Sequence, residues 1–104
     1  MGPLKQKTIT VNTDIATTIA AARQVISQYG WKVSFMDSNS IKASTGISIW
    51  GWGETITIQT NGTGNTTYLN IQSKSAWALV DFGKNQENIN KFLMKLSKFL
   101  FSFT

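Results

Sequence analysis

The chain has 104 residues, of which 41% are hydrophobic and 14% are charged, a balance typical of one folded domain and not of a disordered chain. It contains no cysteine and no histidine, which excludes disulfides, thiolate nucleophiles and the side chain that most often serves as a general base or metal ligand. The net charge of +5 is compatible with polyanion binding, but the basic residues are spread along the chain and form no nucleic-acid-binding arm.

The first predicted elements are a strand and a helix. Residues 5–11 alternate between polar and apolar side chains, which predicts a strand. The polar run at residues 12–14 is typical of a helix N-terminus, so we expect a helix over residues 14–29, closed by Gly30 in a left-handed cap. The buried stripe of this helix is expected to consist of Ile15, Ile19, Ala22, Ile26 and Tyr29. Four polar residues of the helix are expected to lie mostly off this stripe: Thr17, Thr18, Gln24 and Gln28.

Four further strands are expected, at residues 31–35, 41–49, 54–60 and 66–74. A turn at residues 37–40 and a loose loop at residues 61–65 separate two pairs of them. Gly46 indicates a bulge or bend in the third strand. The core side of the second and third strands is expected to carry Trp31, Val33, Phe35, Ile41, Ala43, Ile47 and Ile49.

A long amphipathic helix near the C-terminus is expected to close the core. Its apolar residues recur at spacings of three and four, the pattern of a helix that packs on one side. They are Ile89, Phe92, Leu93, Leu96 and Leu100. The lysines are expected on the opposite face: Lys84, Lys91, Lys95 and Lys98.

The element order predicts an α+β fold, a single βαββββα domain over residues 1–104. We expect a five-stranded, mainly antiparallel sheet with both helices on one face, because each strand has one apolar side. The second to fifth strands should form a meander, and the first strand should join the sheet after the first helix. A two-sheet sandwich fits less well, since it leaves no place for two amphipathic helices.

This order is similar to the topology of the TATA-box-binding protein repeat. The run from Ile56 onward also resembles the C-terminal half of an uncharacterised bacterial domain family. That resemblance is carried by the alternating serines Ser73 and Ser75, by Asp81 and Gly83 in an Asp-x-Gly loop, and by an Asn-x-x-x-Ile helix start. This helix start appears here as Asn85 and Asn88-Ile89. The family often has arginines around this loop, where the present chain has Trp77, Leu79 and Lys84. The resemblance implies the fold and no activity.

Two segments are candidate binding sites. Trp50 and Trp52 lie in a Trp-Gly-Trp-Gly string that could stack on sugar rings or unpaired bases, with Trp77 as a neighbour, or could fold over the sheet end. The turn Asp81, Gly83, Lys84 and Asn85 could hold an anion at a helix start, or Asp81 could simply cap the helix. The structural interpretation is favoured in both cases.

The open face of the sheet is a third candidate surface. It should be polar to basic and could contact a nucleic-acid backbone or a partner protein, but it lacks the aromatic pair of RNA-binding sheets and offers Tyr68 alone. Its expected members are Thr55, Thr57, Gln59, Tyr68, Asn70, Gln72, Lys32, Ser34, Lys42 and Ser44.

We therefore expect a non-catalytic binding module with no cofactor, metal or catalytic site, because the five carboxylates are scattered over caps, turns and a strand start. Nucleic-acid binding is the alternative, and association of the last helix with a membrane surface is a third. Phe101 and Phe103 would suit a homodimer contact. The N-terminal residues lack an apolar signal core, which favours the cytoplasm.

Overall fold

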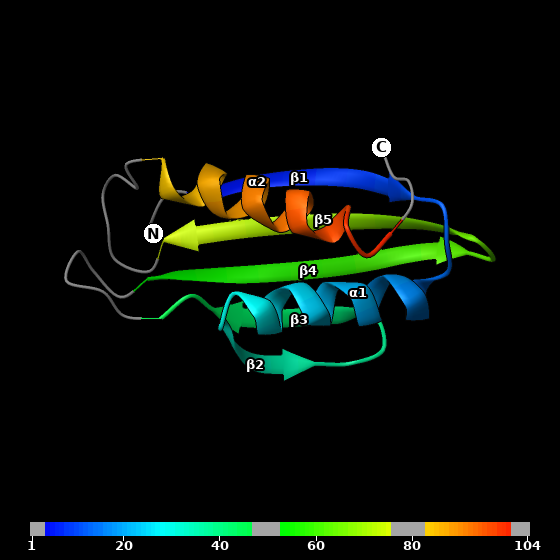
Figure 1. Ribbon diagram of the computed structural model, residues 1–104, viewed down its shortest axis with the longest axis horizontal. Helices are drawn as coiled ribbons and strands as arrows, with labels where there is room; N and C mark the ends of the chain where they lie inside the picture. Colours follow the sequence, from blue (N-terminus) through cyan, green and yellow to red (C-terminus); the bar gives the residue numbers. More distant parts are fainter. Residues whose placement is uncertain (1–3, 47–52, 76–82, 101–104) are drawn as a thin grey trace.

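A computed structural model describes residues 4–46, 53–75 and 83–100 of the chain. It contains five strands and two helices in the predicted βαββββα order (Figure 1). The elements are β1 (Leu4–Val11), α1 (Ile15–Gln28), β2 (Lys32–Met36), β3 (Ser40–Ser44), β4 (Glu54–Thr63), β5 (Thr66–Ser75) and α2 (Lys84–Leu96).

The five strands form one sheet in the order β1-β5-β4-β3-β2, and all neighbouring strands are antiparallel. The second to fifth strands therefore form the predicted meander, and the first strand joins its free edge beside β5 after the α1 connection. The prediction of an α+β domain with one antiparallel sheet is confirmed.

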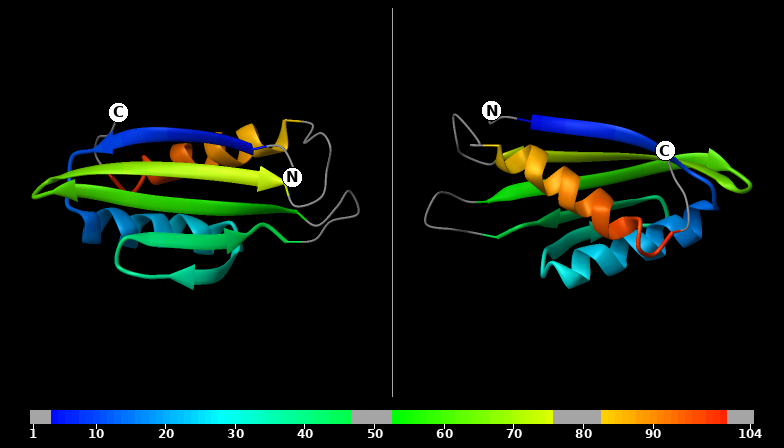
Figure 2. Two further views of the ribbon diagram at one scale, coloured as in Figure 1. Left: turned by 180° about the vertical axis from the view of Figure 1, so that it is seen from behind. Right: turned by 45° about the horizontal axis from the view of Figure 1, so that its top comes forward.

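Both helices cover the same face of the sheet, and no helix of the described residues lies on the other face (Figure 2). The α2 stripe is buried as predicted, with Ile89, Phe92 and Leu96 at 0% exposure. Burying these side chains is the main favourable term in the folding of such a layer. From the sheet, the core receives Ile9, Val11, Ile41, Ala43, Ile56, Ile58, Leu69 and Ile71.

Helix α1 begins and ends where the sequence predicts. The Asp14 carboxylate accepts a hydrogen bond from the Thr17 backbone N–H at 3.0 Å, and Gly30 has the left-handed φ of 70° expected beyond the helix end. The prediction that Thr18 lies off the buried stripe is wrong, because its side chain is fully buried. Its hydroxyl donates to the Asp14 carbonyl at 2.8 Å, which satisfies the buried group.

The cap makes stability depend on pH in a defined direction. Hydrogen bonds from Thr17, first from its side chain and then from its backbone N–H, hold the pKa of Asp14 below its ordinary value of 3.8. A lowered folded-state pKa contributes stability that is present above pH 3.8 and is lost as pH falls through the folded-state pKa. We expect Asp14→Asn, which keeps a capping oxygen, to be less stable than the wild type at pH 6 and equally stable at pH 2 in urea unfolding. An equal difference at both pH values would contradict this role.

Strand β2 departs from the prediction. The register shifts between Val33 and Phe35, and Phe35 pairs with Lys42, which lies on the open face. Such a bulge reverses the side to which the following residues point. Phe35 is consequently 53% exposed and not in the core, and Val33 is also exposed at 42% because β2 is the sheet edge farthest from α2. Trp31, just before the strand, is buried as expected.

The ends of the long strands also differ from the prediction. Strand β4 continues to Thr63, so the predicted five-residue loop contracts to a turn at residues 64–65. Strand β3 ends at Ser44, before Gly46, and the expected core residues Ile47 and Ile49 lie outside the described residues. A Cβ on Gly53 would clash with the Gly46 carbonyl oxygen, so the chain just after β3 and just before β4 can approach this closely only because residue 53 is glycine.

Among residues 4–46, 53–75 and 83–100, no helix is both long enough and apolar enough to cross a bilayer.

Candidate functional site

Polar side chains gather beneath the first turns of α2, where β4 begins and β5 ends. Strand alternation directs Ser73 and Ser75 toward the helix, and a spacing of three directs Asn85 and Asn88 toward the sheet. All four are buried, with exposed fractions of 3% or less. Of the residues that carry the resemblance, these four form a single cluster.

Asn85 joins the two serines of β5. The Ser73 hydroxyl donates to Asn85 Oδ1 at 2.8 Å, and Asn85 Nδ2 donates to Ser75 Oγ at 3.0 Å. Because the Ser73 proton is used in this way, Ser73 Oγ acts as an acceptor toward its other neighbour. The contact with Asn85 therefore fixes the direction of the next hydrogen bond in the cluster.

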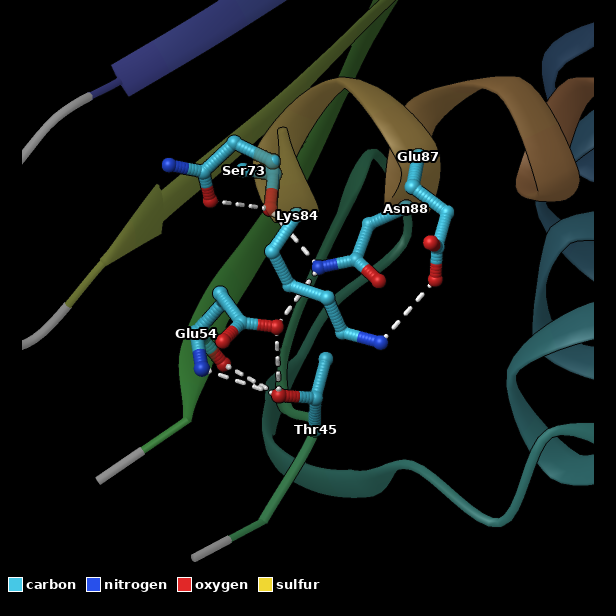
Figure 3. Close-up of polar contacts among 7 residues, drawn as sticks. Thr45, Glu54, Ser73, Lys84, Glu87 and Asn88 are labelled. Atoms are coloured by element: carbon cyan, nitrogen blue, oxygen red, sulfur yellow. Dashed lines mark hydrogen bonds and ion pairs between the residues drawn. The ribbon is translucent and has the colours of Figure 1, made fainter. Parts of the chain in front are cut away.

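Asn88 extends the cluster to the start of β4. Its Nδ2 donates to Glu54 Oε1 at 2.8 Å and to Ser73 Oγ at 3.2 Å (Figure 3). Thr45, the residue after β3, supports the carboxylate: its hydroxyl donates to Glu54 Oε1 at 3.1 Å and accepts from the Glu54 backbone N–H at 2.9 Å. An ionised carboxylate accepts and does not donate, so the nitrogen of the Asn88 amide must face Glu54.

The orientation of the amide leaves the Asn88 oxygen without a partner among the described residues. Asn88 Oδ1 is a buried acceptor that receives no hydrogen bond from residues 4–46, 53–75 or 83–100, and Figure 3 shows it on the side of the Lys84 side chain. A buried polar atom without a partner costs about 1–3 kcal/mol. A donor from outside the chain, either a water or a ligand, would remove this cost.

Asn88 lines a cavity of about 270 Å³. One wall is formed by Tyr29 and Trp31, whose rings stack with centroids 5.2 Å apart. Lys91 reaches over this pair, with Nζ 4.9 Å from the Tyr29 ring centroid, and its carbonyl accepts a hydrogen bond from the Tyr29 hydroxyl at 2.9 Å. The other lining residues are Thr45, Gly46, Gly53, Glu54 and Lys84.

The lysines of α2 differ in their surroundings and do not form the uniform solvent-facing row that the sequence predicts. Lys91 and Lys95 both lie over the Tyr29 ring and so contribute to the aromatic wall. Lys84 forms an ion pair with Glu87 at 3.0 Å, with both side chains largely exposed. The hydrogen bond and charge of Lys84 hold the pKa of Glu87 below its usual value.

The residues of the predicted anion site at the start of α2 do not converge on one point. Lys84 lines the cavity, whereas the Asn85 side chain is enclosed in the serine cluster and is not directed at an anion. The N-cap residue is Gly83, with φ 77° and no side chain to cap the helix. Asp81, the predicted cap, lies outside the described residues, as do Trp50, Trp52 and Trp77.

Tyr68 is placed on the open face of β5, 47% exposed, on the opposite side of the sheet from the cavity. The structure therefore does not bring it together with Lys84. Sequence reasoning missed Asn88, Glu54 and the Tyr29–Trp31 wall as site residues. The signal that could have found the first was the match between alternating serines on a strand and asparagines spaced by three on a helix.

A larger cavity of about 680 Å³ lies between α1 and the β2–β3 turn. Its walls combine apolar side chains, such as Ile19 and Met36, with polar ones, such as Arg23. The Asp37 carboxylate that reaches it accepts three hydrogen bonds of 2.8–3.0 Å from Asn39 and Ser40 within its own turn. This carboxylate therefore has a structural role. Among the described residues, the buried side-chain atom without a partner is Asn88 Oδ1, so the smaller cavity is the better candidate site.

The described residues contain no group of three acidic side chains able to hold a metal ion. No curated protein matches the chain. The sequence pattern of one protein family matches residues 4–96, which is most of the chain, and the description of that family names no reaction and no ligand. The chain thus belongs to the DUF1499 family, whose description is "Protein of unknown function".

Proposed function

We propose that the domain is a non-catalytic binding module whose ligand occupies the cavity beside Asn88. One observation carries the proposal: the Asn88 amide oxygen is buried, is oriented by its neighbours and has no partner in the described part of the chain. Buried polar groups without a partner are uncommon in folded proteins, and each one lowers the stability of the fold unless a hydrogen-bond donor binds it. A donor group on a ligand supplies the missing hydrogen bond.

The lining defines the class of ligand. The Asn88 oxygen and the Glu54 carboxylate accept hydrogen bonds, so the inner end of the ligand carries hydroxyl or amine donors. Lys84 and Lys91 supply positive charge, so the other end carries an anionic group. The aromatic wall favours an apolar ring face. A volume of about 270 Å³ is below that of most drug-sized sites, and a sugar acid combines these features.

The non-catalytic character rests on residue types. The chain has neither histidine nor cysteine, and Glu54 already accepts hydrogen bonds from Asn88 and Thr45. Such a carboxylate orients a ligand more readily than it transfers protons. The proposal retains Trp50 and Trp52 as ligand contacts, because the glycines that flank their segment, Gly46 and Gly53, both line the cavity.

Three probes test the ligand class by amide NMR titration at millimolar concentration. D-glucuronate carries both donors and an anion, D-glucose carries donors alone, and acetate carries an anion alone. We expect glucuronate to shift the Asn88 side-chain amide and the Trp31 indole signal, with smaller shifts from glucose and lysine-centred shifts from acetate. The absence of shifts at Asn88 and Trp31 with all three probes would contradict the proposal.

Replacement of the unpaired acceptor tests the site itself. Asn88→Leu keeps a similar volume and removes the oxygen together with the Nδ2 donor to Glu54 and Ser73. We expect it to weaken glucuronate binding about tenfold or more, which is at least the value of one buried hydrogen bond. Asn90→Leu is the matched control, because Asn90 lies on the exposed side of the same helix. Equal losses in the two variants, both folded by circular dichroism, would show that the cavity is not the site.

A further inference from the structure

We propose that the helix-free face of the sheet binds single-stranded nucleic acid, independently of the cavity beside Asn88. The strand register identifies the residues of this face, because paired residues of adjacent strands point to the same side. One row crosses the sheet as Leu4, Lys74, Thr55, Ser44 and Lys32, and the next as Gln6, Gln72, Thr57, Lys42 and Phe35.

The charge of this face has one sign in the described part of the chain. Lys32, Lys42 and Lys74 are exposed and lie in two adjacent rows. The described carboxylates are elsewhere: Asp14 caps α1, Asp37 folds into its turn, Glu54 joins the buried cluster and Glu87 lies on α2. The face is therefore complementary to a polyanion. The lysines would release the cations condensed on its phosphates when they bind.

Between and beyond the lysines the face carries neutral amides and hydroxyls. Asn70 Nδ2 donates to Thr8 Oγ1 at 2.9 Å, and Gln72 Nε2 donates to Gln6 Oε1 at 3.2 Å, so these side chains form a ladder across β1 and β5. Amides offer both donors and acceptors and can pair with base edges without a charge of their own.

The bulge in β2 adds an aromatic group that the alternating sequence pattern places in the core. Phe35 is 53% exposed and lies beside Lys42, and Tyr68 is 47% exposed toward the other end of the face. Exposed rings on a basic face are the combination that stacks unpaired bases with little sequence preference. Stacking requires bases that are not in a duplex, which favours single strands. A lipid surface fits less well, since Leu4 and Phe35 are separated by polar side chains.

The test measures fluorescence anisotropy of a labelled twelve-residue oligo-dT between 20 and 200 mM NaCl. Three phosphate contacts predict a slope of log K against log salt of about −2, from about −0.7 per contact. The triple variant Lys32→Gln/Lys42→Gln/Lys74→Gln should bind at least about tenfold more weakly at 20 mM salt and lose most of the slope.

The matched control is Lys5→Gln/Lys7→Gln/Lys98→Gln, which makes the same change in net charge at exposed lysines away from this face. We expect it to keep the affinity within about threefold and to leave the slope near its wild-type value. Phe35→Ala/Tyr68→Ala should weaken binding without changing the slope, because stacking releases no counterions. All of the substituted positions are exposed, and the fold of each variant is checked by circular dichroism.

Four results would overturn the proposal. They are equal losses in the two lysine triples, binding of a twelve-base-pair duplex as tight as that of the single strand, no effect of the aromatic variant, and binding to phosphatidylserine vesicles without any binding of oligo-dT. The expected pattern is single-strand binding that the open-face triple removes and the control triple keeps. Loss of glucuronate binding in Asn88→Leu leaves this pattern unchanged, so the two proposals fail separately.

Discussion

Phe92→Ala is expected to lower the free energy of unfolding by about 3–5 kcal/mol, the usual cost of truncating a buried phenylalanine. Phe92 is the largest fully buried side chain and lies on the α2 stripe that covers the sheet. Domains of this size are stable by about 5–15 kcal/mol in total, so the variant should be partly unfolded at room temperature or melt far below the wild type. Urea unfolding followed by circular dichroism measures the loss.

The control for this change is Met94→Ala, two residues further along the same helix and 67% exposed. Surface substitutions of this kind change stability by about 0.5 kcal/mol or less. A loss below about 1 kcal/mol for Phe92→Ala would mean that α2 does not close the core, because a cavity of this size cannot form at so small a cost.

Asn85→Leu is expected to lower the free energy of unfolding by about 2–4 kcal/mol, although it makes the interior more apolar. The change leaves the Ser73 and Ser75 hydroxyls without the partners that they contact at 2.8 and 3.0 Å. A buried polar group that loses its partner costs about 1–3 kcal/mol. The loss is measured by urea unfolding at neutral pH.

A second substitution separates broken hydrogen bonds from poor packing. The double variant Asn85→Leu/Ser75→Ala removes both partners of one hydrogen bond, and we expect it to be more stable than Asn85→Leu alone, since removing both groups is far less costly than orphaning one. If the double variant is the less stable of the two, overpacking by leucine and not the orphaned hydroxyl is responsible for the loss.

Much of the fold could be predicted from the sequence because its signals are local. The α2 stripe of Ile89, Phe92 and Leu96 and the Asp14 cap depend on spacing along one helix, and both predictions are confirmed. The error at Phe35 has a different origin. A bulge is a property of two paired strands, so the alternation within residues 31–35 gives no sign of it.

The candidate site was harder to predict for a related reason. Asn88 and Glu54 are 34 residues apart in sequence, and each alone is typical of an exposed helix face or a strand start. Their contact depends on how α2 lies across the sheet, which no single-sequence pattern encodes. The Lys84 position was anticipated at the helix start, and its ion pair with Glu87 is a local contact at a spacing of three, whereas its place in the cavity wall follows only from the fold.

The bulge in β2 also affects the tendency of this protein to aggregate through the edge of its sheet in a concentrated solution. Strand β2 is an outer strand, and its free backbone edge and exposed Val33, Phe35 and Met36 could template pairing with another chain. The register shift shortens the regular part of this edge, and Lys32 adds a charge at its start. Both features oppose edge-to-edge pairing between copies, so the irregularity that exposes Phe35 also makes this edge a poorer template for another strand.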